Sequence, residues 1–548
     1  MNRRGAASRV MARWPALPVV AICAACSQPD GNAAPPAPAT PVAKVDDRQP
    51  IPKPPSEPVK TPMPAPFPSN AMALQPIADP RIVSVNSLDE VPDSTWFTNR
   101  NTVSPLSADA IRKGPGPHAT PRDDARWTII GVKETGVALG LRAVDETGAK
   151  FFLKFDPDGH HEVETGADVV VQRLLFAAGY NVPENDVVYV SRAALTIDPK
   201  ATFGRTKRAL RGADVDRLLA RAARETDGRY RVLASRFLPG SALGGTEPAG
   251  RRRGDPNDAI PHEHRRDVRG LYTLAAWLNH TDIKSANTLD VWIPDPADPS
   301  RGHVVHYLLD FGKALGAITR IDPRPEAGFA HDGAIKHRVK EIATLGHVKP
   351  PWADIGPFPD LRGLGWIESE RFDPANWKPL HPWLPFVAAD RFDKFWGARI
   401  VMSFTPEQIR AALAAARYTD PRTVEYLARV LVERQRKIGE HFFGRVAPLE
   451  RFRVNRDALC FDDLRVRYGL RSNDAIYAAE VRGDHAQPWR QTGRSNAQGT
   501  VCLADVPRLP EAVTTAIEVR VAGPGRVDPA TVVHLTGGRP AVVAIERR

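Results

Sequence analysis

Short apolar runs separated by glycine-containing turns predict the first folded part of the chain. Residues 127–131, 141–145 and 150–155 show this pattern, with alternating or β-branched apolar side chains. Runs of this length between turns are typical of an antiparallel meander. Residues 187–190 and 232–238 have the same character and predict two further strands. An antiparallel sheet is therefore expected here.

Helical spacing of apolar residues follows the first three predicted strands. Residues 168–178 place apolar side chains on one face and end at a glycine, and residues 264–278 repeat the pattern. From about 330 to 445 the pattern is again helical, most clearly over 406–416 and 423–443. Together with the strands, these segments predict an α+β fold.

The last hundred residues return to a strand pattern. The β-type runs are 475–481, 500–503, 516–521, 531–535 and 541–545, separated by Gly, Pro and Asn turns. This spacing predicts a small β-sandwich over residues 449–548. No catalytic constellation is visible in it, so we expect an accessory module that offers a surface to another protein of the cell envelope.

The segment before the predicted sheet has a different composition. Residues 27–80 contain sixteen prolines and few aromatic residues. Such a segment cannot bury enough apolar surface to offset the entropy lost on ordering. The sequence therefore predicts a disordered, Pro-rich tether, followed by an N-terminal extension over 81–124.

The first residues predict export. Arg3, Arg4 and Arg9 give a basic start, and an apolar run follows over residues 16–25, which is shorter than the roughly 20 residues that span a bilayer. The position of Cys26 after two alanines resembles the lipobox of bacterial lipoproteins, although Cys23 stands where that family usually has Leu. The resemblance implies a signal peptide over 1–26, a lipid anchor on Cys26 and, from Ser27, the outer membrane, with the protein facing the periplasm or the cell surface. An ordinary signal peptide cut nearby is the alternative.

Cysteine content and charge agree with this location. Two of the four cysteines lie in the signal region, which leaves Cys460 and Cys502. In an oxidising compartment this pair predicts a disulfide, with two buried free thiols as the alternative. The net charge of +11 is spread along the chain instead of forming a basic face, so no nucleic-acid partner is expected.

Polar residues at fixed spacing lie between the predicted elements. Residues 280–287 read His-Thr-Asp-Ile-Lys-Ser-Ala-Asn, and residues 307–312 read Tyr-Leu-Leu-Asp-Phe-Gly. Upstream, Lys154 ends the third predicted strand. The order resembles that of protein kinases, which carry a strand lysine, a catalytic loop His-x-Asp-x-Lys-x-x-Asn and an Asp-Phe-Gly segment.

The kinase resemblance implies ATP and Mg²⁺ as cofactors. Lys154 would hold the α- and β-phosphates. An acid on the following helix would fix Lys154, and Asp168 is the first choice, with Glu164 and Glu162 as alternatives.

The same resemblance assigns the remaining roles. Asp282 would orient the attacking hydroxyl, and Lys284 would neutralise charge near the transferred group. Asn287 and Asp310 would supply oxygen ligands to Mg²⁺. His280 would be a structural, hydrogen-bonding residue.

The chain departs from ordinary protein kinases in several places. Gly131, Gly136 and Gly140 replace the usual Gly-x-Gly-x-x-Gly loop, and a polar insert covers 294–302. Residues 168–183 are more similar to the atypical branch that includes HipA-type kinases, spore-coat CotH proteins and secretory-pathway kinases.

The resulting expectation is a bilobal, protein-kinase-like core over residues 125–448, with an antiparallel-sheet N-lobe and a helical C-lobe. Its function would be to bind Mg-nucleotide and transfer a phosphoryl group to a hydroxyl of a protein or small molecule. Because the periplasm is poor in ATP, a catalytically inactive kinase-fold scaffold is the alternative. A third interpretation is another α+β envelope protein in which the motifs occur by chance.

Overall fold

The computed structural model describes residues 46–57, 82–123, 125–132, 139–203, 208–332, 335–482, 489–507, 510, 513–523, 526–527, 529–538 and 540–548. All of them belong to one compact unit, Thr40–Arg548. The predicted signal peptide with Cys26, and the loop glycine Gly136, lie outside the described residues. No helix in the described ranges is long and apolar enough to cross a membrane.

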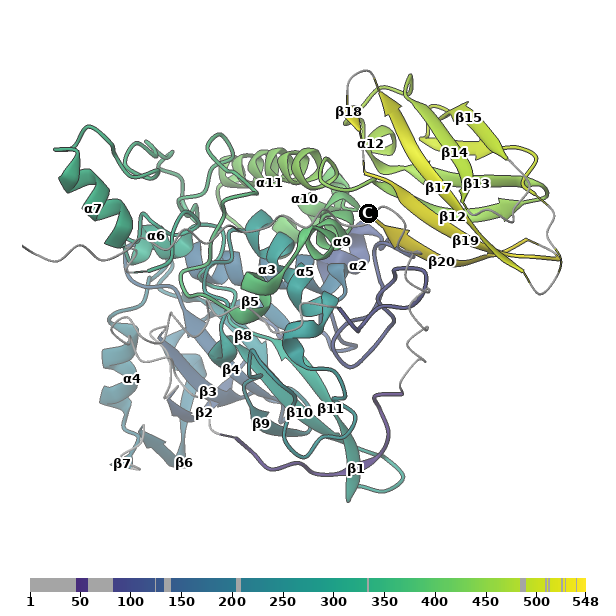
Figure 1. The fold of residues 1–548 in the computed structure, drawn as a ribbon. Helices are drawn as coiled ribbons and strands as arrows, with labels where there is room; N and C mark the ends of the chain where they lie inside the picture. Colours follow the sequence, from purple (N-terminus) through teal and green to yellow (C-terminus); the bar gives the residue numbers. More distant parts are fainter. Residues whose placement is uncertain are drawn as a thin grey trace, which may run out of the picture. The chain divides into compact units, whose positions relative to one another are not determined.

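A seven-stranded sheet occupies the first part of the chain (Figure 1), in the order β5-β8-β4-β3-β2-β6-β7. Its strands are β2 (Trp127–Val132), β3 (Gly140–Val144), β4 (Lys150–Phe155), β5 (Asn185–Val190), β6 (Leu195–Phe203), β7 (Arg208–Ala209) and β8 (Tyr230–Arg236). The five predicted strands are confirmed, and their apolar side chains form one buried cluster.

The prediction that this sheet is wholly antiparallel is wrong, because β2 and β6 pair in parallel. The chain leaves β5 at one edge of the sheet and crosses to the other edge, where β6 runs alongside β2 in the same direction. Strand β6 contains Pro199 and the polar residues Asp198 and Lys200, so its sequence lacks the apolar pattern of the predicted strands.

Helices form the second part of the core, and the longer ones share a second apolar cluster. The longer ones are α3 (Val163–Ala178), α5 (Arg266–Trp277), α9 (Arg391–Met402), α10 (Pro406–Ala415) and α11 (Pro421–Phe442). The shorter ones are α2 (Ala108–Lys113), α4 (Gly212–Leu219), α6 (Ala317–Ile321), α7 (Ile335–Ala343), α8 (Leu384–Ala388) and α12 (Leu464–Arg467). The structure is thus a mixed α+β fold.

Two helix predictions need correction. Helix α3 begins at Val163, five residues before the predicted start, because Asp156 caps its first turn. The expected helical pattern from 330 to 445 is interrupted, since residues 344–383 contain no helix. Proline and glycine recur in that stretch and break helices.

A four-stranded sheet in the order β1-β11-β10-β9 lies beside the helices. It consists of β1 (Ile51–Pro52), β9 (Ser241–Gly244), β10 (Thr288–Pro294) and β11 (Arg301–Leu308). The predicted polar insert 294–302 is the turn of the β10–β11 hairpin.

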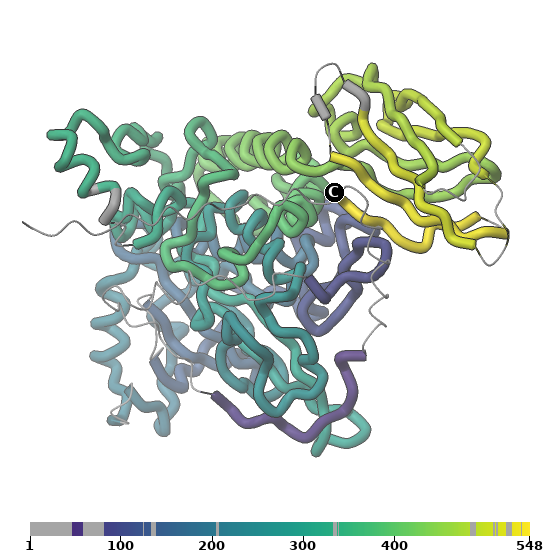
Figure 2. The backbone as a smooth tube through the Cα atoms, in the orientation of Figure 1, coloured from purple at the N-terminus to yellow at the C-terminus, as the bar shows by residue number. Residues whose placement is uncertain are grey.

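The prediction of a disordered tether is wrong for residues 46–57. Ile51 pairs with Gly302 at one edge of the sheet, and the Glu57 N–H donates to the Leu243 carbonyl at 2.7 Å at the other edge. Figure 2 shows this purple segment running along the hairpin. Hydrogen bonds at the sheet edges and the burial of Ile51 offset the conformational entropy that this segment loses on ordering. The prediction from composition did not include these contacts.

The N-terminal extension also packs on the core. Phe97 is fully buried, and its ring meets that of Trp396 on α9 edge to face at 5.0 Å. The Phe97 backbone forms a bridge to Tyr180, just after α3. Residues before the sheet therefore contribute to the helical core.

The C-terminal part contains two antiparallel sheets that share one apolar cluster. One comprises β12 (Leu449–Asn455), β13 (Ala458–Asp463) and β16 (Thr500–Leu503). The other comprises β14 (Ile476–Arg482), β15 (Arg490–Arg494), β17 (Thr514–Gly523), β18 (Arg526–Val527), β19 (Thr531–Thr536) and β20 (Val542–Arg547). All five predicted runs are strands, and a disulfide joins Cys460 to Cys502 across β13 and β16.

Candidate functional site

The ammonium group of Lys154, on strand β4, lies between two carboxylates. Its Nζ is 3.3 Å from Oδ2 of Asp168 on α3 and 2.9 Å from Oδ1 of Asp310. The side chains of Lys154 and Asp168 are 15% and 1% exposed, whereas that of Asp310 is 37% exposed. Burial alone would lower the pKa of Lys154, but the charges of Asp168 and Asp310 outweigh it and raise the pKa. The lysine is therefore charged at neutral pH.

Among the three acids proposed to fix Lys154, the contact is made by Asp168. Glu164 forms an ion pair with Lys313, and Glu162 with Arg362. Asp168 lies in the second turn of α3, and its Oδ1 also accepts a hydrogen bond of 2.7 Å from the Asn185 amide. This second bond fixes the orientation of the carboxylate that faces Lys154.

The predicted catalytic loop forms a tight hydrogen-bonded cluster around Asp282. Lys284 Nζ lies 2.6 Å from Asp282 Oδ1. The Asn287 amide nitrogen donates to the Asp282 carbonyl at 2.7 Å and to Asp282 Oδ2 at 3.1 Å. Both carboxylate oxygens of Asp282 thus accept hydrogen bonds from residues of its own loop.

The backbone next to Asp310 connects the loop around Asp282 to the contacts of Lys154. The Leu309 N–H donates to the Asn287 carbonyl at 2.9 Å. Asp310 then adopts a φ of +60°, in the left-handed region. For a residue other than glycine this conformation costs of order 1 kcal/mol and persists where its surroundings impose it. Here it accompanies the contact between the Asp310 carboxylate and Lys154.

His280 is buried among apolar groups, with its ring 5.7 Å from that of Phe311. Burial lowers its pKa to about 4, so the imidazole is neutral at neutral pH. Nδ1 has no hydrogen-bond partner among the described residues. The expected hydrogen-bonding role is therefore not seen at this atom, and the ring packs instead.

Sequence reasoning missed Asp156, two residues after Lys154. Its carboxylate accepts backbone N–H groups of Glu162, Glu164 and Thr165 at 2.8–3.0 Å, and the Thr165 hydroxyl at 2.6 Å. These bonds satisfy the free donors at the start of α3, the helix that carries Asp168. The sequence pattern did not indicate this cap, because the acceptor lies directly after strand β4 and not at the residue before the helix.

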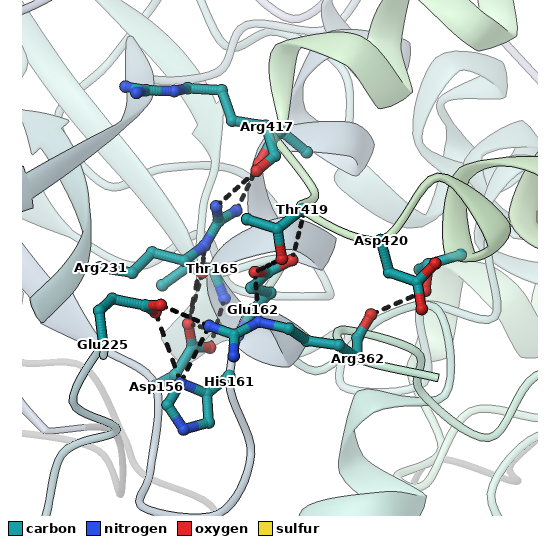
Figure 3. Close-up of polar contacts among 12 residues, drawn as sticks. Asp156, His161, Glu162, Thr165, Glu225, Arg231, Arg362, Arg417, Thr419 and Asp420 are labelled. Carbon is teal, nitrogen blue, oxygen red and sulfur yellow. Dashed lines mark hydrogen bonds and ion pairs between the residues drawn. The ribbon is translucent and has the colours of Figure 1, made fainter. Parts of the chain in front are cut away.

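Arg362, from a later part of the chain, forms ion pairs at the start of α3 (Figure 3). Its guanidinium donates to Glu162 and to Glu225, both at 2.6 Å. Glu162 also accepts the Thr419 N–H at 2.9 Å. Three distant segments of chain therefore meet at the start of α3 and hold it in place.

The oxygen atoms near Asp310 fit a hard cation. The Asn287 amide nitrogen donates a hydrogen bond to Asp282, so the amide oxygen of Asn287 is the atom that would bind a cation. No group of three or more His, Cys, Asp or Glu residues that could hold a metal ion occurs in the described part of the chain. Mg²⁺ is often bound through only one or two protein oxygens together with phosphate oxygens and water. Asn287 and Asp310 are side chains that offer oxygen atoms of this kind.

Gly131 was expected to contact the nucleotide. It lies in β2 at an irregularity in the pairing with β3. A Cβ at this position would come within 2.5 Å of the Arg142 guanidinium. The missing side chain thus makes room for Arg142, and no contact with the Lys154 cluster is found for Gly131 within the described ranges.

No protein-family model and no curated protein matches this chain. One solved structure that does match is a proinflammatory kinase of Helicobacter pylori, CtkA. The two chains are 12% identical, and the match covers 56% of this chain and 90% of that one with a TM-score of 0.28. A likeness of this size establishes neither the fold nor the activity.

Proposed function

We propose that this chain is an envelope-anchored, kinase-like phosphotransferase. It would bind Mg²⁺ with ATP or another nucleotide and transfer a phosphoryl group to a hydroxyl of a protein or small molecule. One observation carries this proposal: Lys154 contacts both Asp168 and Asp310, which are 14 and 156 residues away in sequence. Asp310 is in turn tied to the Asp282 loop through the bond between Leu309 and Asn287.

The roles follow from the chemistry of phosphoryl transfer, which depends mainly on positioning and on charge neutralisation. Lys154 would bind phosphate oxygens, and Asp168 would keep its ammonium group in place. Asp282 would accept a hydrogen bond from the attacking hydroxyl, with Lys284 compensating charge beside it. Mg²⁺ held by Asn287 and Asp310 would neutralise phosphate charge.

A second candidate is a nucleotide-binding scaffold without turnover. Both carboxylate oxygens of Asp282 already accept hydrogen bonds, from Lys284 and from Asn287. These two bonds occupy part of the acceptor capacity that a catalytic base would offer to a substrate hydroxyl. This arrangement supports binding without transfer.

We further propose that Cys26 carries a lipid anchor that places the protein at the outer membrane. The two C-terminal sheets would serve as an accessory surface for another envelope protein. Cys26→Ser is expected to move the protein from the membrane fraction to the soluble fraction. An unchanged distribution would contradict lipidation.

Thermal unfolding of residues 40–548, the compact unit, tests nucleotide binding. Mg-ATP at a hundredfold excess over its Kd should stabilise the protein by about 2.7 kcal/mol. Asp310→Ala should abolish this shift, and Asp109→Ala, at an 85% exposed carboxylate, should not. No shift at millimolar ATP with Mg²⁺ or Mn²⁺ would contradict the proposal.

Radiolabel transfer from ATP separates the two candidates. A phosphotransferase should label itself or added envelope protein, and Asp282→Ala should remove the label while leaving the Mg-ATP thermal shift. A scaffold should show the thermal shift and no label in any variant. Label that persists in both Asp282→Ala and Asp310→Ala would contradict the assigned site.

A further inference from the structure

Exposed apolar side chains gather on one short segment of the helical part. Val339, Ile342, Leu345 and Val348 are 55%, 75%, 90% and 38% exposed. The other large hydrophobic side chains that the described residues expose are distributed singly along the chain. Isolated exposed apolar residues are normal, but a continuous group indicates a surface that is covered in use.

The four residues, called the apolar stripe below, follow one another at intervals of three in the sequence. Val339 and Ile342 are three residues apart on α7 and share a face of that helix. The chain then turns, with the Gly346 N–H donating to the Glu341 carbonyl at 2.8 Å. The Val348 N–H donates to the Thr344 hydroxyl at 3.1 Å. These bonds hold the turn through Val348 against the end of the helix.

Leu345 occupies a strained position in this turn. Its φ is +49°, a conformation that costs of order 1 kcal/mol for a residue other than glycine. The strain is usual where burial or function compensates it, yet Leu345 is the most exposed residue of the stripe. The helix end accounts for the φ, because the Gly346 and Leu345 N–H groups donate to the Glu341 and Ile342 carbonyls as in a Schellman motif. Burial in the core does not account for leucine at this exposed position.

Basic residues accompany the stripe. Residues 335–349 contain four lysines and arginines against one glutamate, a net charge of +3 with histidines neutral. Lys340 and Lys349 are both exposed, and Lys349 lies 3.4 Å from the Asp354 carboxylate. The ring of His337 on the same helix contacts that of Trp352 at 4.9 Å, which attaches α7 to the rest of the helical part. In Figure 1, α7 lies at the margin of the ribbon, beyond α6.

We propose that α7 and the turn through Val348 form a membrane contact, which inserts its apolar stripe among the headgroups of a bilayer that contains anionic lipids. Short helices with an apolar face and a basic flank bind in this way, at a depth of about 5–10 Å. Charge complementarity favours an anionic bilayer over an apolar protein groove, since each basic residue near such a surface strengthens binding roughly fivefold. The contact goes beyond the proposed lipid anchor and would orient the helical part against the membrane.

Vesicle binding by residues 40–548 tests the proposal without Cys26 or nucleotide. The protein should sediment with vesicles of phosphatidylethanolamine and phosphatidylglycerol, and at least about tenfold less with phosphatidylcholine vesicles or at high salt. The pair Ile342→Asp with Leu345→Asp should weaken binding by about tenfold or more. Lys340→Glu with Lys349→Glu should weaken it on anionic vesicles alone.

Val103→Asp is the matched control, because Val103 is 73% exposed at a distant point of the sequence. It should bind vesicles like the parent protein. All substituted side chains are exposed, and unchanged thermal unfolding of each variant checks that the fold is retained. Equal vesicle binding by the parent and the Ile342→Asp, Leu345→Asp variant would overturn the proposal.

Two other outcomes would also overturn it. The first is that the parent protein does not bind anionic vesicles. The second is that it forms a dimer that the Ile342→Asp, Leu345→Asp pair disrupts, which would show that a second copy covers the stripe. Either result leaves the nucleotide-dependent thermal shift untouched, so the failure of this inference is distinguishable from the failure of the proposed function.

Discussion

Lys154 Nζ lies 2.9 Å from Asp310 Oδ1, although 156 residues separate them in the chain. The same ammonium group contacts Asp168, which is almost completely buried. One cation therefore compensates one buried carboxylate and one that is more than a third exposed. Solvent reaches part of the Asp310 carboxylate, whereas the buried charge of Asp168 is compensated by Lys154.

This dependence predicts the effect of removing the lysine. Lys154→Met leaves Asp168 as an uncompensated buried charge, which should destabilise the fold by about 3–5 kcal/mol. Adding Asp168→Asn removes that charge and should restore more than half of the loss in urea unfolding. Lys150→Met, at an exposed lysine of the same strand, is the control and should have little effect. A double variant no more stable than Lys154→Met would contradict the buried pair.

His280 predicts a pH dependence of stability. Its folded-state pKa of about 4 lies below the value of about 6.5 expected in the unfolded chain. Between these values the unfolded chain binds the proton and the folded chain does not, so the free energy of unfolding decreases as the pH falls. The full difference is about 3 kcal/mol, present above pH 6.5 and lost toward pH 4. His280→Leu should lack this component, and His347→Asn, at an exposed histidine, should keep it in urea unfolding across that range.

The cap at the start of α3 predicts that Asp156 supports the site from a distance. Asp156→Ala removes the acceptor of three backbone N–H groups and one hydroxyl, which should cost about 3–5 kcal/mol. It should also weaken Mg-ATP binding, because the helix that carries Asp168 loses its first turn. Asp158→Ala, at an exposed neighbour, should change neither quantity. Equal nucleotide affinity in the two variants would show that α3 does not need this cap.

The ordered segment before the predicted extension has its own test. The Asp47 carboxylate accepts the Thr95 N–H at 2.7 Å and the Thr95 hydroxyl at 2.9 Å. Asp47→Ala should therefore destabilise residues 40–548 by about 1–3 kcal/mol in chemical unfolding. The bonds of Asp46 found among the described residues are to Arg48 and Gln49, so Asp46→Ala should stay within about 0.5 kcal/mol of the parent. Equal effects of the two substitutions would mean that residues 46–57 add no stability.

The disulfide should stabilise the C-terminal sheets. Cys460 and Cys502 are 42 residues apart, and closing a loop of this size contributes about 4 kcal/mol in the chain-entropy model. Replacing both cysteines by serine should lower the unfolding midpoint of this part of the chain. Dithiothreitol should lower the midpoint of the parent protein and leave that of the variant unchanged.

Much of the candidate site could be predicted because its residues lie in short motifs. Lys154 follows three apolar residues of a predicted strand, and residues 280–287 follow an amphipathic helix. The sequence pattern could rank Asp168, Glu164 and Glu162 but could not decide among them, since all three lie within two turns of one helix. The ion pairs of Glu164 with Lys313 and of Glu162 with Arg362 separate them, and both partners come from later in the chain.

The sequence by itself determined the main strands, the long helices and the spacing of the polar motifs, because each depends on periodicity within a few neighbouring residues. Only the tertiary structure decided that β6 runs parallel to β2, that residues 46–57 lie along the hairpin, and that Asp156 caps α3. The physical reason is that these features depend on hydrogen bonds between distant segments, whose partners local periodicity does not specify. The meeting of Lys154 with Asp310 belongs to the same class, since folding alone brings the two motifs together.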